Sequence, residues 1–230
     1  MSSTNELLMK NEEQTKRSNN ANVALGIIGT SFIGIIALTS PFIIMQLRSP
    51  LPYMATPRRK VLEALNEIAS RKGTNTNQPL RYYDLGSGDG EAVLAAASAG
   101  WRATGIELNS TLWGISSFRR LISHHLIRRK ANFVWGDMWK EKINDADAVM
   151  IFGVKPLMPQ IAKKIETECR PGTFVMSYRF HIPIYGICDD SMGGLSSQSV
   201  KDEGALGADL VYDEEEMRIY LLRDDKQDTR

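Results

Sequence analysis

The chain has 230 residues and carries 28 Lys and Arg against 27 Asp and Glu, which gives a formal net charge of +1. That length fits one domain of ordinary size with an additional segment, and the balanced charge gives no support to a nucleic-acid-binding protein. Two cysteines, Cys169 and Cys188, exclude a disulfide framework, and His124, His125 and His181 lack metal-ligand spacing, so we predict no metal site.

The N-terminal part of the chain divides into a polar stretch and an apolar stretch. We predict that residues 1–22 are disordered because they are polar. No charged residue occurs from Ser18 to Leu47, and residues 23–47 are predicted as a transmembrane or targeting segment, because about 20 apolar residues span a bilayer core. The alternative is a buried core helix of unusual length. Basic residues after this segment slightly favour a C-terminal domain on the positive-inside face: Arg48, Arg58, Arg59 and Lys60.

Residues 48–78 are predicted to form a linker and an amphipathic helix. Pro50 and Pro52 make the linker stiff. Thr56 is the expected N-cap of the helix, with Pro57 at its first position. We expect the helix to pack on a sheet or to cover a ligand, because its apolar residues recur at helical spacing, namely Val61, Leu62, Leu65 and Ile68.

The stretch from Tyr82 to Gly90 predicts a strand and a tight glycine loop, and a helix then begins at Glu91. Its glycines do not match the dinucleotide motif G-x-G-x-x-G, because Glu91 occupies the third position. Its acids disfavour a pyrophosphate and suit a ligand with an ammonium group, a sulfonium and ribose hydroxyls. S-adenosylmethionine has all three groups. The alternative is a plain glycine turn. The acids are Asp84, Asp89 and Glu91.

Three more predicted strands end in residues that suit the same ligand. Residues 101–109 form a strand that ends at Glu107, about 20 residues beyond the loop, where an acid accepts hydrogen bonds from ribose hydroxyls. Residues 132–139 form a strand that ends at Asp137. Residues 146–156 contain the continuous apolar run of a buried parallel strand, and a glycine then turns the chain at the carboxyl edge.

The remaining elements complete an α/β fold with a mixed sheet over residues 79–223, followed by a polar tail at 224–230. Helices are expected over 110–129 and 159–169, and strands over 173–179 and 217–222, the last of them antiparallel. Residues 189–207 are either a substrate loop or a surface insertion. The apolar stripe of the first helix is expected to lie in the core and comprises Leu112, Ile115, Phe118, Leu121, Ile122 and Leu126.

These motifs, in this order, resemble class I methyltransferases. More specifically, the chain resembles the mitochondrial protein-lysine methyltransferases that act on the ATP synthase c subunit and on the adenine nucleotide translocase. Glu91 replaces the usual Arg of that family, and Lys155 replaces the usual Pro of the c-subunit enzymes. The resemblance runs from the apolar segment to about Pro183, and its motifs are Pro52–Thr56, Asp84–Gly90, Gly105–Asn109, Asp137–Trp139, Ile151–Val154 and Arg179-Phe180.

The resemblance implies a class I methyltransferase, Rossmann-like mixed sheet behind an N-terminal transmembrane helix, with S-adenosylmethionine as cofactor. Asp137 is expected to face the adenine amino group and Met138 to pack on the adenine ring. Phe152, Gly153 and Val154 are expected to line the channel for the substrate amine. The expected cofactor-binding residues are Asp84, Gly86, Ser87, Gly88, Asp89, Gly90, Glu107, Asp137 and Met138.

The implied activity is that of a membrane-anchored, S-adenosylmethionine-dependent protein-lysine N-methyltransferase acting on the ATP synthase c subunit. The implied location is the mitochondrial inner membrane, with the catalytic domain facing the matrix, an inner-membrane protein as substrate and no nucleic-acid partner. The alternatives are methylation of the adenine nucleotide translocase, a lipid or quinone methyltransferase, and a membrane-anchored adaptor that keeps the fold as a scaffold. The adaptor is opposed by five residues that suit cofactor binding, namely Asp84, Gly86, Gly88, Glu107 and Asp137.

Overall fold

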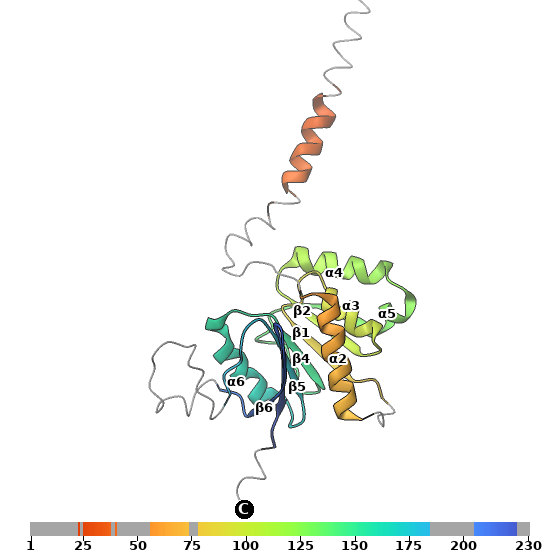
Figure 1. Ribbon diagram of the computed structural model, residues 1–230. Coiled ribbons are helices and arrows are strands. Elements are labelled where there is room, and N and C mark those ends of the chain that lie inside the picture. The colour runs from red at the N-terminus through yellow and green to blue at the C-terminus, as the bar shows by residue number, and fades with distance from the viewer. Residues whose placement is uncertain are drawn as a thin grey trace, which may run out of the picture. The chain divides into compact units, whose positions relative to one another are not determined.

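The computed structural model describes residues 23, 25–37, 40, 56–73, 78–184 and 205–224 (Figure 1). The chain forms two compact units, residues 1–50 and residues 51–230. In the first unit, residues 25–37 are helical, and the large apolar side chains of this helix are exposed.

The transmembrane helix predicted over residues 23–47 finds no support in the described residues. None of their helices is both long enough and apolar enough to cross a membrane. Residues 24, 38, 39 and 41–47 lie outside the described part of the chain. So do the predicted polar stretch 1–22, the prolines at 50 and 52, residues 189–204 and residues 225–230.

The second unit is built on a seven-stranded sheet with the order β3-β2-β1-β4-β5-β7-β6. Neighbouring strands among β1 to β5 are parallel, whereas β7 pairs antiparallel with both β5 and β6, which confirms the predicted mixed sheet. The strand order reverses between β1 and β4, the position at which α/β sheets bind ligands. The strands are β1 (Arg81–Leu85), β2 (Arg102–Glu107), β3 (Ala131–Trp135), β4 (Ala148–Ile151), β5 (Phe174–Tyr178), β6 (Ala208–Glu214) and β7 (Met217–Leu222).

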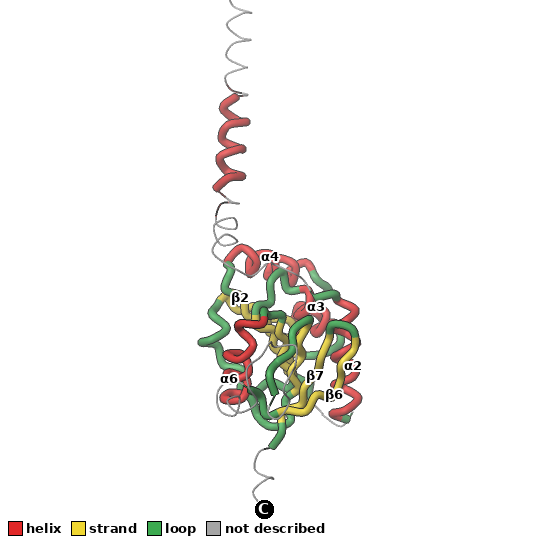
Figure 2. Tube along the Cα trace, turned by 60° about the vertical axis from the view of Figure 1, so that its left-hand side comes forward, coloured by secondary structure: helices red, strands yellow, loops and turns green. Residues whose placement is uncertain are grey.

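Helices cover the sheet on both faces (Figures 1 and 2). One apolar cluster joins the sheet to α2 and α3, and a second joins the opposite face to α6. The helices are α2 (Arg58–Lys72), α3 (Glu91–Ser98), α4 (Ser110–Ile122), α5 (His125–Lys130) and α6 (Met158–Glu168), with a short 3₁₀ turn, η1, at Lys155–Leu157.

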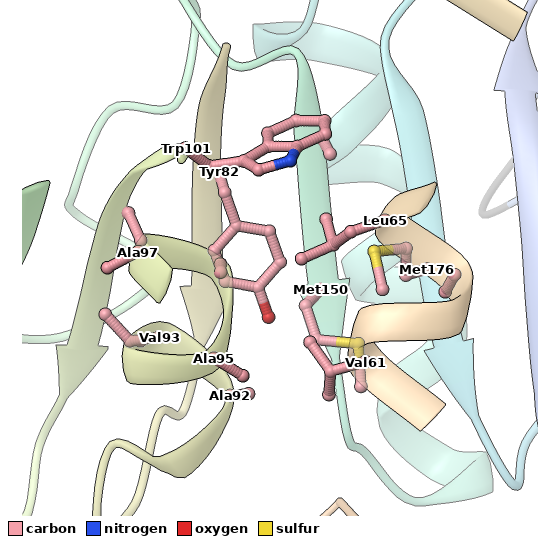
Figure 3. Close-up of a cluster of buried hydrophobic side chains, with 14 of the residues drawn as sticks. Val61, Leu65, Tyr82, Ala92, Val93, Ala95, Ala97, Trp101, Met150 and Met176 are labelled. Atoms are coloured by element: carbon pink, nitrogen blue, oxygen red, sulfur yellow. The ribbon is translucent and has the colours of Figure 1, made fainter. Parts of the chain in front are cut away.

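The first cluster centres on Tyr82, which is fully buried. Figure 3 shows its ring between α3 and α2, next to Trp101. Val61 and Leu65, two of the apolar residues predicted to pack on the sheet, are fully buried in this cluster. The cluster therefore fixes α2 and α3 on the face that leads to the glycine loop.

The predicted helix over 110–129 is wrong in two respects. It breaks into α4 and α5 at Ser123, whose backbone is extended (φ −71°, ψ 159°). Its apolar stripe is largely exposed rather than buried, and Ser116 is the one buried residue of α4. Strand β6 was also not predicted, although the strand over 217–222 was predicted correctly.

Candidate active site

The carboxyl ends of the parallel strands meet at one edge of the sheet and carry most of the predicted site residues. The glycine loop follows β1, Glu107 ends β2, Asp137 follows β3 and Phe152 follows β4. The N–H groups of Gly86 and Ser87 both donate to the carbonyl oxygen of Ile106, at 2.9 and 3.0 Å, and so fasten the loop to β2.

The glycine loop needs glycine at three positions because Gly86, Gly88 and Gly90 have φ angles of 83°, 55° and 81°. A Cβ atom on Gly90 would lie 2.4 Å from Cζ of Phe133, so this glycine also allows α3 to pack closely. A Cβ atom on Gly86 would meet no atom within 4 Å. The backbone at Gly86 therefore faces open space in which a ligand can approach it.

Glu107 joins the glycine loop to the end of β2. The Gly88 N–H donates to its Oε2 and the Asn109 N–H donates to its Oε1, each at 2.8 Å. Two backbone donors thus hold the carboxylate in place, although only 9% of the residue is exposed. Each oxygen keeps a further lone pair, which is what two ribose hydroxyl groups require.

Asp84 and Ser87 are buried residues whose side chains have no hydrogen-bond partner among the described residues. Asp84 is 5% exposed, and its carboxylate makes no hydrogen bond with any described residue. Burial, with the nearby charges of Glu107 and Asp89, raises the pKa of Asp84 to about 7. The Ser87 hydroxyl is also buried without a partner among the described residues. Such groups are costly unless a ligand satisfies them.

Asp89 is engaged by another side chain rather than left free beside the loop. Arg119 of α4 donates to the Asp89 carboxylate at 2.5 Å and to its carbonyl oxygen at 3.1 Å. Arg119 also pairs with Glu91, which in turn pairs with Arg58 of α2 at 3.4 Å. These two arginines offset the acids at the start of α3, where the helix N-terminus also favours negative charge.

Asp137 and Met138 lie beyond the end of β3. Asp137 accepts a hydrogen bond from the Trp139 N–H at 3.0 Å, and its side chain is partly exposed. Met138 packs partly buried against the second apolar cluster. The neighbouring Gly136 N–H donates to the carbonyl oxygen of Glu107 at 3.1 Å, which holds the two strand ends together.

Phe152, Gly153 and Val154 follow β4 beside an aromatic residue that sequence reasoning missed. The Phe152 ring lies 5.6 Å from the ring of Tyr178, the last residue of β5. Gly153 is buried, and an added Cβ would lie 3.0 Å from Cε of Met158. Val154 is half-buried. The amine channel expected from the sequence therefore adjoins a pair of aromatic rings.

An ion pair lies next to Tyr178, between Arg179, which follows β5, and Glu216, which precedes β7. Arg179 has a φ of 70°, rare for a residue with a side chain, and its Nε lies 3.1 Å from both carboxylate oxygens of Glu216. Its N–H also donates to the Glu216 carbonyl oxygen at 2.6 Å. The sequence signal was the Arg179-Phe180 motif, but the partner Glu216 lies 37 residues away.

The described residues contain no group of three or more His, Cys, Asp or Glu side chains able to hold a metal ion. A cavity of about 260 Å³ is lined by residues of α2, α3, α4 and α5. None of the predicted cofactor-binding residues lines it. Its lining includes Arg58, Glu91, Leu94, Arg119, Ile122 and Ile127.

Comparison with known proteins identifies the family. The profile of the ANTKMT methyltransferase domain matches residues 84–186. The ATP synthase c-subunit lysine N-methyltransferase of Rattus norvegicus is 37% identical over 172 residues, which cover 74% of this chain and 76% of that protein. The chain belongs to this family of protein-lysine N-methyltransferases.

Other relatives of this protein-lysine N-methyltransferase show how far the similarity extends. The adenine nucleotide translocase lysine N-methyltransferase of Mus musculus is 31% identical over 145 residues, 61% of this chain and 58% of that protein. A crystal structure of an RNA methyltransferase from Salinibacter ruber with S-adenosyl-L-homocysteine has 21% identity and a TM-score of 0.53, and covers 77% of this chain and 99% of that one. The similarity to this crystal structure establishes the class I methyltransferase fold.

The residues of this methyltransferase fit S-adenosylmethionine. The open backbone at Gly86 admits the ligand, and Glu107 offers two fixed acceptors for its ribose hydroxyls. Asp84 and Ser87 offer buried groups that a ligand would satisfy. The arrangement suits a cationic ligand, because the buried carboxyls outnumber the positive charges that contact them.

Proposed function

We propose that the protein is an S-adenosylmethionine-dependent lysine N-methyltransferase that acts on the ATP synthase c subunit. The observation that carries the proposal is the strand edge. Glu107, held by two backbone N–H groups, lies beside an open glycine loop that contains the unpartnered Ser87 and that follows Asp84 of β1. The substrate is inferred from relatives named for that activity, of which the rat protein covers 74% of this chain.

The residues of the edge divide into cofactor and substrate groups. We propose that Glu107 binds the ribose hydroxyls, while the glycine loop and Asp84 hold the end of the ligand that bears the ammonium group. Asp137 and Met138 are proposed to contact the adenine. When bound, S-adenosylmethionine supplies an electrophilic methyl group on a sulfonium.

The substrate lysine has to be neutral to accept that methyl group. A free lysine has a pKa of about 10.4 and is mostly protonated at neutral pH. Phe152 and Tyr178, whose ring centroids are 5.6 Å apart, provide an apolar environment that favours the uncharged amine. We propose that these rings desolvate the amine and align it, and that water takes the proton before the amine enters.

Methylation of the adenine nucleotide translocase is the second candidate function. The profile of the ANTKMT methyltransferase domain matches residues 84–186, and the adenine nucleotide translocase lysine N-methyltransferase of Mus musculus is 31% identical. The c subunit is favoured because five relatives with that name match between 70% and 74% of this chain, whereas the translocase enzyme matches 61%.

We also propose that the apolar segment attaches the chain to the mitochondrial inner membrane with the domain facing the matrix. Support comes from the absence of charge between Ser18 and Leu47 and from the exposed apolar side chains of residues 25–37. Tethering enzyme and substrate to one bilayer would raise their effective concentration. Deleting residues 1–47 should weaken methylation of a membrane-embedded substrate and spare cofactor binding. Equal activity of both forms on membranes would refute the tether, and protease protection in isolated mitochondria would test the location.

The test of the activity is transfer of labelled methyl groups from S-adenosylmethionine into detergent-treated mitochondrial membranes, with Asp84→Ala as the inactive control. We expect label on a lysine of a very small proteolipid that dissolves in organic solvent. A labelled carrier protein would assign the activity to the translocase instead. Label in extracted lipid without labelled protein would refute lysine methylation and favour a lipid or quinone substrate.

A further inference from the structure

Helices α4 and α5 and the adjoining strand ends form an exposed apolar surface, which we call the α4–α5 face. Its side chains are between 44% and 68% exposed, although large apolar residues in single domains are normally buried or scattered. A contiguous apolar surface of this kind marks an interaction site. The face comprises Leu108, Ile115, Phe118, Leu121, Ile122, Leu126 and Trp135.

The residues of the face lie on neighbouring elements, because α4 contacts α5 and also the strands β2 and β3. Ile115, Phe118 and Ile122 recur at helical spacing along one side of α4, and Leu121 borders them. At the other end, the Trp135 indole N–H donates to the carbonyl oxygen of Leu108 at 3.1 Å. Leu108 directly follows Glu107, so the face reaches the carboxyl edge that holds the candidate active site. Both ribbon views place α4 at one end of this unit (Figures 1 and 2).

Helices α4 and α5 carry cations and no acidic residue of their own. No Asp or Glu occurs between Glu107 and Asp137. Arg119 pairs with Asp89 and Glu91. Four further cations on α4 and α5 make no ion pair with any described residue: Arg120, Arg128, Arg129 and Lys130.

We propose that the α4–α5 face docks on the surface of an anionic lipid bilayer. An apolar helix face bordered by Lys and Arg is the chemistry of an interfacial helix, whose apolar side enters the headgroup boundary while its cations contact anionic lipids. Trp135, apolar in its body and with one polar N–H, suits the same boundary. A soluble partner would need acidic groups to match the cations and an apolar surface to match the helix. A bilayer supplies both along its whole surface.

This contact is distinct from the apolar segment of residues 23–47 and belongs to the folded domain. Under the proposed function, on which this consequence rests, the contact also holds the carboxyl edge of the sheet, where methyl transfer takes place, beside the membrane. Vesicle binding itself requires neither cofactor nor substrate. Failure of methyl transfer and failure of docking are therefore separate results.

The experiment places an environment-sensitive fluorophore on the face of the full-length chain. In a Cys169→Ser, Cys188→Ser background, Phe118→Cys puts the label at the centre of the face. Thr167→Cys puts a matched label on an exposed position of α6, on the opposite side of the sheet. Vesicles contain either phosphatidylcholine alone or equimolar phosphatidylcholine and phosphatidylglycerol.

We expect the label at residue 118 to shift to the blue and to be quenched by spin-labelled lipid with the anionic vesicles. The label at 167 should not respond. Replacing Arg128 and Arg129 by Gln should raise the lipid concentration needed for half of the response by about 30-fold. Each cation near an anionic surface contributes about a fivefold factor in affinity. Lys142→Gln with Lys163→Gln, which removes two exposed cations elsewhere, should change it little.

A second readout needs no cysteine variant. Brominated anionic lipid should quench tryptophan fluorescence of the natural chain, and Trp135→Phe should remove that quenched component. The proposal is overturned if neither probe responds to anionic vesicles while the protein is bound to them. It is also overturned if the label at 118 becomes shielded with rising protein concentration alone, which would indicate self-association. A response seen only in vesicles that contain the ATP synthase proteolipid would assign the face to a protein partner.

Discussion

Asp84→Asn tests whether the buried acid of β1, next to the glycine loop, destabilises the protein without its ligand. The Asp84 carboxyl is 5% exposed, has no hydrogen-bond partner among the described residues, and has a pKa raised from 3.8 to about 7 by burial and by Glu107 and Asp89. Asn has the same shape and no charge. The substitution should therefore stabilise the ligand-free protein while weakening S-adenosylmethionine binding.

The sign and size of the expected change in the free energy of unfolding follow from proton linkage. Between pH 4 and pH 7 the unfolded chain has already lost the Asp84 proton and the folded chain has kept it, so the free energy of unfolding falls as the pH rises. A rise of about three in pKa, at 1.36 kcal/mol per pKa unit, corresponds to about 4 kcal/mol above pH 7. Asp84→Asn should recover most of this at pH 8 and almost none at pH 4.

The assay is urea unfolding of both proteins at several pH values, followed by tryptophan fluorescence, with calorimetric titration of S-adenosylmethionine. Asp209→Asn is the control, because Asp209 is exposed and its pair with Arg223 should contribute under about 1 kcal/mol at any pH. Loss of stability in Asp84→Asn by the same amount at pH 4 and pH 8 would refute the reasoning. So would unchanged cofactor affinity.

Three further predictions concern the glycine loop and the end of β2. Gly86→Ala should abolish S-adenosylmethionine binding in calorimetry but cost only about 1–2 kcal/mol of stability. Gly172→Ala is its control, because Gly172 has a similar φ and open space but lies away from the site; it should cost the same stability and leave binding unchanged. Gly90→Ala should cost clearly more than Gly172→Ala in urea unfolding because its methyl group would clash, and equal costs would refute that packing account. Glu107→Gln should cost about 1–3 kcal/mol of stability, because its amide NH₂ would face one of two buried N–H donors. It should also weaken cofactor binding, and unchanged binding would show that Glu107 is not part of the site.

The sequence was sufficient to predict the sheet edge and its principal groups. The glycine loop and Glu107 belong to short, local strand–loop–helix units, whose spacing along the chain determines where they lie. Parallel pairing then brings Gly86, Glu107 and Asp137 to the same edge regardless of loop detail. The strand β7 was predicted as a final antiparallel strand, and it pairs antiparallel with β5 and β6.

The sequence was not sufficient where a partner lies far along the chain. Asp89 was predicted among the cofactor-binding residues, and nothing in the sequence indicated that Arg119, 30 residues away, contacts its carboxylate. Tyr178 was missed because its ring contact with Phe152 depends on the pairing of β4 with β5. Helical periodicity also misassigned the stripe that includes Phe118 to the core, because periodicity finds an apolar face without showing what covers it.

The most direct measurement of the central claim is mass spectrometry of the purified ATP synthase proteolipid, the proposed substrate, in lipid after incubation with the full-length protein and S-adenosylmethionine. The account predicts one or more methyl groups on a single lysine, absent when Asp84→Ala or Glu107→Gln replaces the natural chain. An unmodified proteolipid, under conditions in which calorimetry shows the cofactor bound, would contradict it.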